Sequence, residues 1–218
     1  NIIAHNLRGP VSNIKMFAEE LTLGDNKSST GMNEAFTHDE MLGIIKDSST
    51  SLMETLKVLM EITQIKLNKN LANDECDLNG IIRDIMNQLH GTIYENHASI
   101  ELSLEIKHIT YPKVYLESIL YNLISNAIKY SNPTEPPIII ISSKKVNNRI
   151  VLSVKDNGLG IDMSKYGNKI FKLNQVFHTG YDSKGIGLFL TKTQIESLGG
   201  TIEVKSKPNE GSEFIVTI

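Results

Sequence analysis

An apolar stripe at the start of the chain constrains the fold most strongly, because a hydrophobic residue recurs every three to four positions. Its members are Ile3, Leu7, Val11, Ile14, Phe17 and Leu21. This spacing places them on one face of an amphipathic helix, close to a coiled-coil pattern. We expect the helix to end near Leu23, because Gly24 is a helix stop signal.

A second helix is predicted after a polar loop at residues 24–36. Thr37 and Glu40 have the spacing of a capping box, in which each side chain accepts a hydrogen bond from the other residue's backbone N–H. The helix continues to about Leu67 along the seam Met41, Ile45, Ser48, Leu52, Leu56, Leu59 and Ile62 or Thr63. Because a two-helix hairpin cannot bury both seams well alone, we expect two chains to pair into a dimeric four-helix bundle. The alternative is a monomer whose hairpin packs on its own second domain.

His5 lies off the apolar seam, on the side of the first helix that faces water. A solvent-facing imidazole is mostly neutral at pH 7, so it has a nitrogen lone pair that can act as a nucleophile. Pro10 cannot donate to the carbonyl of Asn6, and we expect the helix to kink or loosen there. Taken alone, such a histidine is more often an ordinary surface residue.

The composition is that of an ordinary globular protein: 218 residues, 40 % hydrophobic and 22 % charged, with a net charge of −3. That charge gives no sign of a nucleic-acid partner or an anionic membrane. Cys76 is the single cysteine, which excludes an internal disulfide and fits a reducing, cytoplasmic compartment. No apolar run reaches the roughly 18 residues of a membrane span. Since His5 already lies in a helical pattern, we expect the chain to be a fragment of a longer protein. We expect any membrane contact to be made by segments upstream of this fragment.

From residue 78 onward, shorter helices alternate with strands. Helices are predicted at 78–94, 112–130 and 185–198. A strand is predicted at 99–106, and hairpins pair 138–145 with 149–155, turning at Asn147-Asn148, and 201–206 with 213–218. This mixture predicts an α/β (α+β) sandwich. The chain then has an all-α hairpin at 1–67, a polar linker at 68–77 that can include a first short strand, and a second domain at 78–218.

One helix of the second domain has an unusual polar face. Asn122 and Asn126 are four residues apart and Lys129 follows three residues later, so the three project from one side. Asparagine is a poor helix former, so this alignment needs a reason. Amide oxygens can ligate Mg²⁺ while nucleotide phosphates supply most of the charge, and lysine binds phosphate. A solvated polar face explains this helix equally well when it is considered alone.

Two glycine-rich stretches also suit a nucleotide. In Asp156-Asn157-Gly158-Leu159-Gly160, directly after a strand, glycines allow a sharp bend and the carboxylate can accept from an adenine amino group. Lys184-Gly185-Ile186-Gly187-Leu188 opens a helix, whose free N–H groups bind anions. Between them, residues 161–184 form a long irregular segment typical of a lid or of disorder, with Phe171 and Phe177 in it. The chain has no GxxxxGK[ST], which excludes a P-loop.

The order and spacing of these stretches resemble those of the sensor histidine kinases of two-component systems. His5-Asn6-Leu7-Arg8-Gly9-Pro10 is similar to their H box, and residues 122–130 to their N box. Residues 156–160 resemble the G1 box, Ile170-Phe171 the F box, and residues 185–188 the G2 box. The resemblance covers nearly the whole chain. It implies a dimerisation and phosphoacceptor domain followed by a catalytic ATP-binding domain of the GHKL, or Bergerat, type.

The resemblance also implies a function: ATP and Mg²⁺ as cofactors, a homodimer, transfer of the γ-phosphoryl group to the H-box histidine, and relay to an aspartate of a response-regulator receiver domain. By matching position, His5 is the phosphoacceptor, Asn6 adjoins it in the catalytic motif, and Asn122 and Asn126 hold Mg²⁺ through ATP. The implied nucleotide-binding residues are Asn122, Asn126, Lys129, Tyr130, Asp156, Gly158, Gly160, Phe171, Lys184, Gly185, Ile186, Gly187 and Leu188.

Two positions depart from the family pattern. Asn6 stands where the family often has an acidic general base, and it cannot take a proton. Gly9 stands where dephosphorylating members tend to have Thr or Asn, and it has no side chain to position a water. We therefore expect slower transfer to His5 and weak phosphatase activity toward the regulator.

Two other functions remain open from the sequence. One is an ATP-hydrolysing machine of the same superfold, of the gyrase or heat-shock chaperone type. Such enzymes place a water-activating glutamate where Asn122 stands, so this residue disfavours hydrolysis. The other is a degenerate nucleotide-binding scaffold that dimerises and holds partners.

Overall fold

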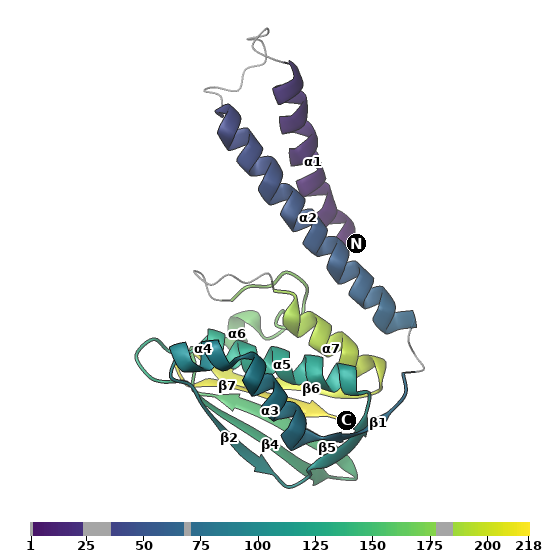
Figure 1. Ribbon diagram of the computed structural model, residues 1–218, viewed down its shortest axis with the longest axis vertical. Helices are drawn as coiled ribbons and strands as arrows, with labels where there is room; N and C mark the ends of the chain where they lie inside the picture. Colours follow the sequence, from purple (N-terminus) through teal and green to yellow (C-terminus); the bar gives the residue numbers. More distant parts are fainter. Residues whose placement is uncertain (1, 24–35, 68–70, 178–184) are drawn as a thin grey trace. The chain divides into compact units, whose positions relative to one another are not determined.

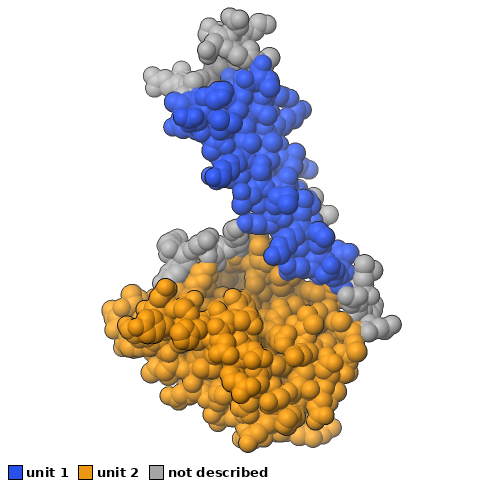
Figure 2. All heavy atoms as spheres, viewed as in Figure 1, with its two compact units in different colours: residues 1–64 blue, residues 65–218 orange. Residues whose placement is uncertain are grey.

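The computed structural model describes residues 2–23, 36–67, 71–177 and 185–218, with side chains described from residue 7 in the first range and up to residue 65 in the second (Figure 1). The chain divides into two compact units, residues 1–64 and 65–218, which Figure 2 distinguishes by colour. Among the described helices, none combines the length and the hydrophobicity that a bilayer crossing requires.

The first unit consists of helices α1 (Ile2–Leu23) and α2 (His38–Leu67). The predicted capping box is confirmed: the Thr37 backbone N–H donates to Glu40 Oε2 at 2.7 Å, and the Glu40 N–H donates to Thr37 Oγ1 at 3.3 Å. α1 continues through Pro10 as a single helix. The Phe17 and Phe36 rings pack nearly perpendicular to each other, with the ring centroids 5.4 Å apart.

The second unit is built on a five-stranded sheet with the order β2-β4-β5-β7-β6. Its strands are β2 (Ser99–Leu104), β4 (Ile138–Val146), β5 (Arg149–Asp156), β6 (Thr201–Lys207) and β7 (Gly211–Thr217). β2 is parallel to β4, and the other neighbours are antiparallel. A separate two-stranded sheet pairs β1 (Asp74–Asp77) with β3 (His108–Tyr111).

Helices cover one face of the main sheet (Figure 1). They are α3 (Leu78–Gln88), α4 (His90–Glu95), α5 (Lys113–Lys129), α6 (Met163–Tyr166) and α7 (Gly187–Ser197). Because strand side chains alternate between faces, Ile139, Ile141 and Val154 all point toward the helices, and each is at most 2 % exposed. α5 supplies the largest share of the helical core, with Leu116, Ile119, Leu120, Leu123, Ile124 and Ile128 buried. One side of α5 is thus fixed in the core, and its Asn122 side is presented to the space above the sheet.

Two features differ from the sequence prediction, and a third confirms one of its alternatives. The helix expected at 78–94 is two helices, separated at Leu89, where ψ is 8° and the side chain is buried; α4 beyond it buries no residue. Strand β3 was not predicted, because four residues are too short for a recognisable alternation. Residues 74–77, assigned to the linker or a first short strand, form β1. The hairpin of β4 and β5 is confirmed, with Asn147 and Asn148 at φ of 48° and 65°, angles that this residue type tolerates in tight turns.

Candidate functional site

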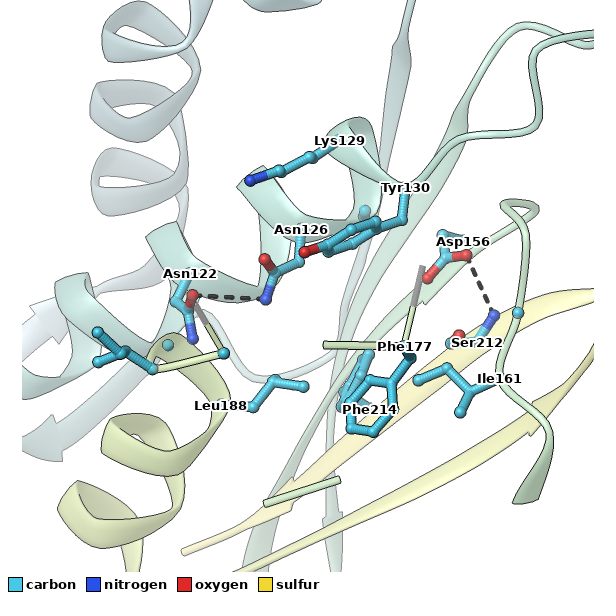
Figure 3. Close-up of a pocket in the computed structure, with 15 residues that line it drawn as sticks. Asn122, Asn126, Lys129, Tyr130, Asp156, Ile161, Phe177, Leu188, Ser212 and Phe214 are labelled. Carbon is cyan, nitrogen blue, oxygen red and sulfur yellow. Dashed lines mark hydrogen bonds between the residues drawn. The ribbon is translucent and has the colours of Figure 1, made fainter. Parts of the chain in front are cut away.

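A cavity of about 410 Å³ lies between α5, the start of α7 and the ends of strands β5 and β7 (Figure 3). Its lining residues are Asn122, Asn126, Ala127, Lys129, Tyr130, Asp156, Gly160, Ile161, Phe177, Gly185, Ile186, Gly187, Leu188, Ser212 and Phe214. The α5 amides and Asp156 lie at opposite ends in Figure 3, with apolar side chains between them. The cavity therefore has two polar ends and an apolar middle, which suits a ligand with the same distribution.

The α5 end presents amide groups held in a fixed chain. Asn122 Nδ2 donates to Thr191 Oγ1 at 2.6 Å, and Asn126 Nδ2 donates to Asn122 Oδ1 at 3.4 Å (Figure 3). Lys129, one turn further along α5, holds its ammonium group 5.7 Å from the centre of the Tyr130 ring. The predicted shared face of Asn122, Asn126 and Lys129 is thus the wall of this cavity.

The first turn of α7 approaches the amides closely. A Cβ atom added to Gly187 would lie 2.2 Å from Asn122 Oδ1, a distance at which the two atoms overlap. Only glycine allows α7 to begin here while Asn122 keeps its position. The backbone N–H groups of this helix start therefore lie beside the amide wall, in a position suited to an anion.

The other end of the cavity is formed by Asp156, whose side chain is 9 % exposed. Its Oδ1 accepts from the backbone N–H of Gly158 at 2.8 Å and of Ser212 at 3.1 Å. Burial raises the pKa of this carboxyl above its usual range, and the two N–H donors oppose that shift. Because a carboxylate accepts through both oxygens, the group retains capacity for a donor from a ligand.

The turn after β5 is packed directly against the end of α5. The Leu159 N–H donates to the Tyr130 carbonyl at 2.9 Å, and a Cβ on Gly158 would lie 2.4 Å from that same oxygen. Gly158 therefore allows the turn to approach α5, and this contact brings Asp156 and Tyr130 to one cavity.

The middle of the cavity is apolar. Ile161, Phe177, Leu188 and Phe214 line it from four separate segments (Figure 3). The Phe177 ring also packs on Tyr166, with the centroids 5.2 Å apart. Aromatic and branched side chains in this arrangement can hold a flat, apolar ring system.

Ten of the predicted nucleotide-binding residues line the cavity: Asn122, Asn126, Lys129, Tyr130, Asp156, Gly160, Gly185, Ile186, Gly187 and Leu188. Gly158 shapes the turn, while Phe171 is outside the lining and lies under the Lys192 ammonium group, 5.4 Å from the ring centre. Lys184 lies outside the described residues. His5 and Asn6 lie in α1, but their side chains are outside the described part of the chain.

Sequence reasoning did not assign five lining residues to the site: Ala127, Ile161, Phe177, Ser212 and Phe214. Ser212 and Phe214 are two positions apart on β7, so they point to the same face of the sheet. That alternation is visible in the sequence, but it does not show that β7 pairs beside β5. The pairing of Lys155 with Glu213 brings Ser212 next to Asp156.

The donor set fits a metal ion that arrives with a ligand. In the described residues, no three His, Cys, Asp or Glu side chains gather into a metal site. Asn122 and Asn126 offer neutral amide oxygens, which are weak ligands alone and need the charge of phosphate oxygens to hold Mg²⁺. The cavity therefore fits a Mg²⁺–phosphate complex rather than a protein-held ion.

Residues 113–218 match the family model described as the histidine kinase-, DNA gyrase B-, and HSP90-like ATPase. Along its whole length the chain is 26% identical to the sensor protein RprX of Bacteroides fragilis and 26% identical to the sensor histidine kinase AtsR of Burkholderia thailandensis. It spans 42% and 36% of those two proteins.

The fold is shared with solved histidine kinases. In a crystal structure of histidine kinase ThkA in complex with response regulator protein TrrA, 59% of the matched chain aligns with 99% of this one, at 22% identity and a TM-score of 0.64. The family match covers α5, the Asp156 turn, α7 and β7, which are the elements that line the cavity. Residues 113–218 therefore form a domain of the histidine kinase-, DNA gyrase B-, and HSP90-like ATPase family, and the whole chain is similar to sensor histidine kinases.

Proposed function

We propose that this chain is the kinase core of a two-component sensor: it transfers the γ-phosphoryl group of ATP to His5 and then to an aspartate of a response regulator. The observation that carries the proposal is that one cavity has two different polar ends. The asparagine amides of α5 and the start of α7 form one end, and the buried Asp156 forms the other. ATP has the matching distribution, with phosphates at one end and an amino-substituted base at the other.

The residues of the cavity divide between the two ends of ATP. Asp156 accepts the adenine amino group, and Ile161, Leu188 and Phe214 enclose the flat base. At the phosphate end, Asn122, Asn126 and the first N–H groups of α7 face the triphosphate, with Lys129 as the cation. Such preorganised donors stabilise charge that develops on a transferring phosphoryl group.

Asn122 and Asn126 are the residues that would hold Mg²⁺, through amide oxygens and the nucleotide phosphates. When bound, Mg²⁺ neutralises charge on the phosphates during transfer. The hydrogen bond from Asn126 to Asn122, and that from Asn122 to Thr191, fix the amide orientations before any ligand arrives.

Transfer to a side chain is favoured over hydrolysis by the residue at position 122. Asn122 cannot remove a proton from water, whereas the hydrolysing relatives of this superfold use a glutamate there. The nucleophile must come from elsewhere in the chain, and His5 in α1 is the H-box residue. A neutral imidazole attacks without first losing a proton, so Asn6 beside it slows transfer without abolishing it.

The phosphoryl group then passes to a response regulator. This step is supported by the similarity of the whole chain to sensor kinases and by the partner in the ThkA complex. We assign the phosphoacceptor hairpin to residues 1–67 and the ATP-binding domain to residues 78–218. Since 74–77 form β1, the linker lies before them. The use of ATP places the chain in the cytoplasm.

We also propose that the hairpin dimerises. Large apolar side chains on its two helices are exposed in the single chain, among them Val11, Leu42, Met53, Leu56 and Met60. Met53 and Met60 are 68% and 64% exposed and two turns apart on α2, so they lie on one face. Each such side chain gains about 1.5–3 kcal/mol when it is fully buried, which favours pairing with a second hairpin. Sedimentation of the chain as a monomer at micromolar concentration would contradict this.

The test of kinase activity is incubation with γ-labelled ATP and Mg²⁺. We expect acid-labile label on the wild type, and none on His5→Gln or Asn126→Asp. His38→Gln is the matched control, because His38 is exposed at the start of α2, and it should be labelled like the wild type. Steady release of free phosphate without label would instead indicate the ATPase. Nucleotide binding with neither label nor release would indicate the scaffold.

A further inference from the structure

Ser206 on β6 connects two parts of the cavity wall although it does not itself line the cavity. Its Oγ accepts from the backbone N–H of Ile161 at 2.7 Å and donates to the Gly211 carbonyl at 2.8 Å. It also lies 2.9 Å from Ser212 Oγ. Ile161 and Ser212 are both lining residues, so one hydroxyl group joins the segment after β5 to strand β7 at the Asp156 end.

The number of protons fixes the direction of this network. A serine hydroxyl has one proton to donate and two lone pairs with which to accept. Ser206 donates its proton to Gly211, and one lone pair accepts from Ile161. The remaining lone pair can only accept, so the bond between the two serines runs from Ser212 to Ser206.

This direction determines what Ser212 presents to the cavity. Its hydroxyl proton is committed to Ser206, so only lone pairs of Ser212 Oγ remain for a ligand. Its backbone N–H is committed to Asp156 Oδ1 at 3.1 Å. Figure 3 shows Ser212, Ile161 and Asp156 gathered at the same end of the cavity. That end therefore offers acceptors from two neighbouring side chains and no hydroxyl donor from Ser212.

We propose that Ser206 is a positioning residue for base selection: by holding the Ser212 proton, it keeps the Asp156 end of the cavity all-acceptor and so favours a 6-amino purine over a 6-oxo purine. This inference rests on the proposed function, in which ATP is the ligand. A 6-amino group donates to these acceptors. A 6-oxo group places an acceptor against the acceptors of Asp156 and Ser212, which are then left without a donor. Selectivity between the two bases depends on this repulsion as much as on the attraction of the 6-amino group.

The test compares the binding of ATP and inosine triphosphate, whose base has an oxo group in place of the 6-amino group and a proton on N1. Dissociation constants are measured by calorimetric titration of the full chain with each nucleotide and Mg²⁺. In Ser206→Ala the Ser212 hydroxyl is released and can turn to donate to a 6-oxo group. We expect ATP to bind about tenfold more weakly, and the preference for ATP over inosine triphosphate to fall at least about threefold.

Two variants separate this role from a general loss of structure. Ser143→Ala is the matched control, because Ser143 is a buried strand serine that exchanges hydrogen bonds with the Ile106 backbone at 2.5 and 3.1 Å, away from the cavity. It should leave the nucleotide preference unchanged. Ser206→Thr keeps the hydroxyl and should restore the preference.

A double substitution tests whether Ser206 acts through Ser212. In a Ser212→Ala background, Ser206→Ala should change the preference no further, because the group it orients is gone. An unchanged preference in Ser206→Ala, or the same loss in Ser143→Ala, overturns the inference. Wild-type chain that binds neither nucleotide overturns the proposed function instead, so the two failures are distinguishable.

Discussion

Asp156→Asn should separate nucleotide binding from folding. The asparagine Oδ1 can still accept from the backbone N–H groups of Gly158 and Ser212, so the turn after β5 keeps its hydrogen bonds. The other side-chain atom becomes an NH₂ group, which meets the adenine amino group donor to donor. The substitution therefore changes the part of Asp156 that faces the ligand and preserves the part that holds the fold.

The magnitude follows from the type of bond that is lost. A hydrogen bond to a charged group contributes about 1.5–3 kcal/mol, and a loss of about 2 kcal/mol raises the dissociation constant for ATP about thirtyfold. At an ATP concentration of about 100 times the wild-type constant, ligand binding stabilises the wild type by about 2.7 kcal/mol. The same concentration would stabilise the variant by only about 0.9 kcal/mol.

Thermal melting with and without ATP and Mg²⁺ is the assay. Without nucleotide, the variant should melt at the wild-type temperature or above it, because a buried charge is removed and no hydrogen bond of the turn is lost. With nucleotide, most of the upward shift should disappear. Asp84→Asn is the control, since it removes an exposed carboxylate from α3, and its shift should match the wild type. A variant that retains the full ATP-induced shift, or that melts well below the wild type without ATP, would refute the reasoning.

Other outcomes follow from single contacts. Gly187→Ala should abolish nucleotide binding, because its Cβ would overlap Asn122 Oδ1; calorimetric titration with ATP checks this, and wild-type affinity would contradict it. Burial raises the pKa of Asp156, so ATP affinity should fall with acidification at a higher pH than an exposed aspartate would require. The effect of pH on folding stability has the opposite sign. Proton uptake by Asp156 stabilises the folded state below the pKa of the unfolded chain, and this stabilisation is lost as the pH rises through the raised pKa of the folded state. Any gain in stability in Asp156→Asn should therefore shrink in acid. Asn6→Asp should raise the autophosphorylation rate by restoring a general base, and an equal or lower rate of labelling counts against that. Gly9 predicts weak phosphatase activity, which rapid ADP-stimulated loss of regulator phosphate would disprove.

The parts of the fold that sequence predicts well are those set by neighbouring residues. Thr37 and Glu40 are three apart, and their reciprocal hydrogen bonds form within one turn. Asn147 and Asn148 turn the chain because their residue type tolerates positive φ. Asn122 and Asn126 share a wall because four residues are only slightly more than one helical turn. In each case, the geometry follows from local spacing or residue type.

The parts that sequence does not predict depend on contacts between distant segments. Ser212 reaches Asp156 through the pairing of β5 with β7, which lie 56 residues apart at this contact. The break at Leu89 depends on where that side chain finds space in the core, which helical periodicity does not encode. The parallel pairing of β2 with β4 likewise depends on tertiary packing, because the residue pattern of neither strand specifies the direction of its neighbour.

Under the proposed function, the placement of charge within the cavity explains why the phosphoacceptor would lie in a separate unit. Among the described residues that line it, Asp156 is the only carboxylate, and it lies at the end opposite the Asn122 wall (Figure 3). Two backbone N–H groups hold it there, and in the proposed function it accepts from the base of the nucleotide. The phosphate end then has amides and a lysine, which stabilise negative charge but cannot activate water. In the proposed function, a cavity of this composition would hold the phosphoryl group without hydrolysing it, so transfer would require a nucleophile supplied from outside the ATP-binding unit.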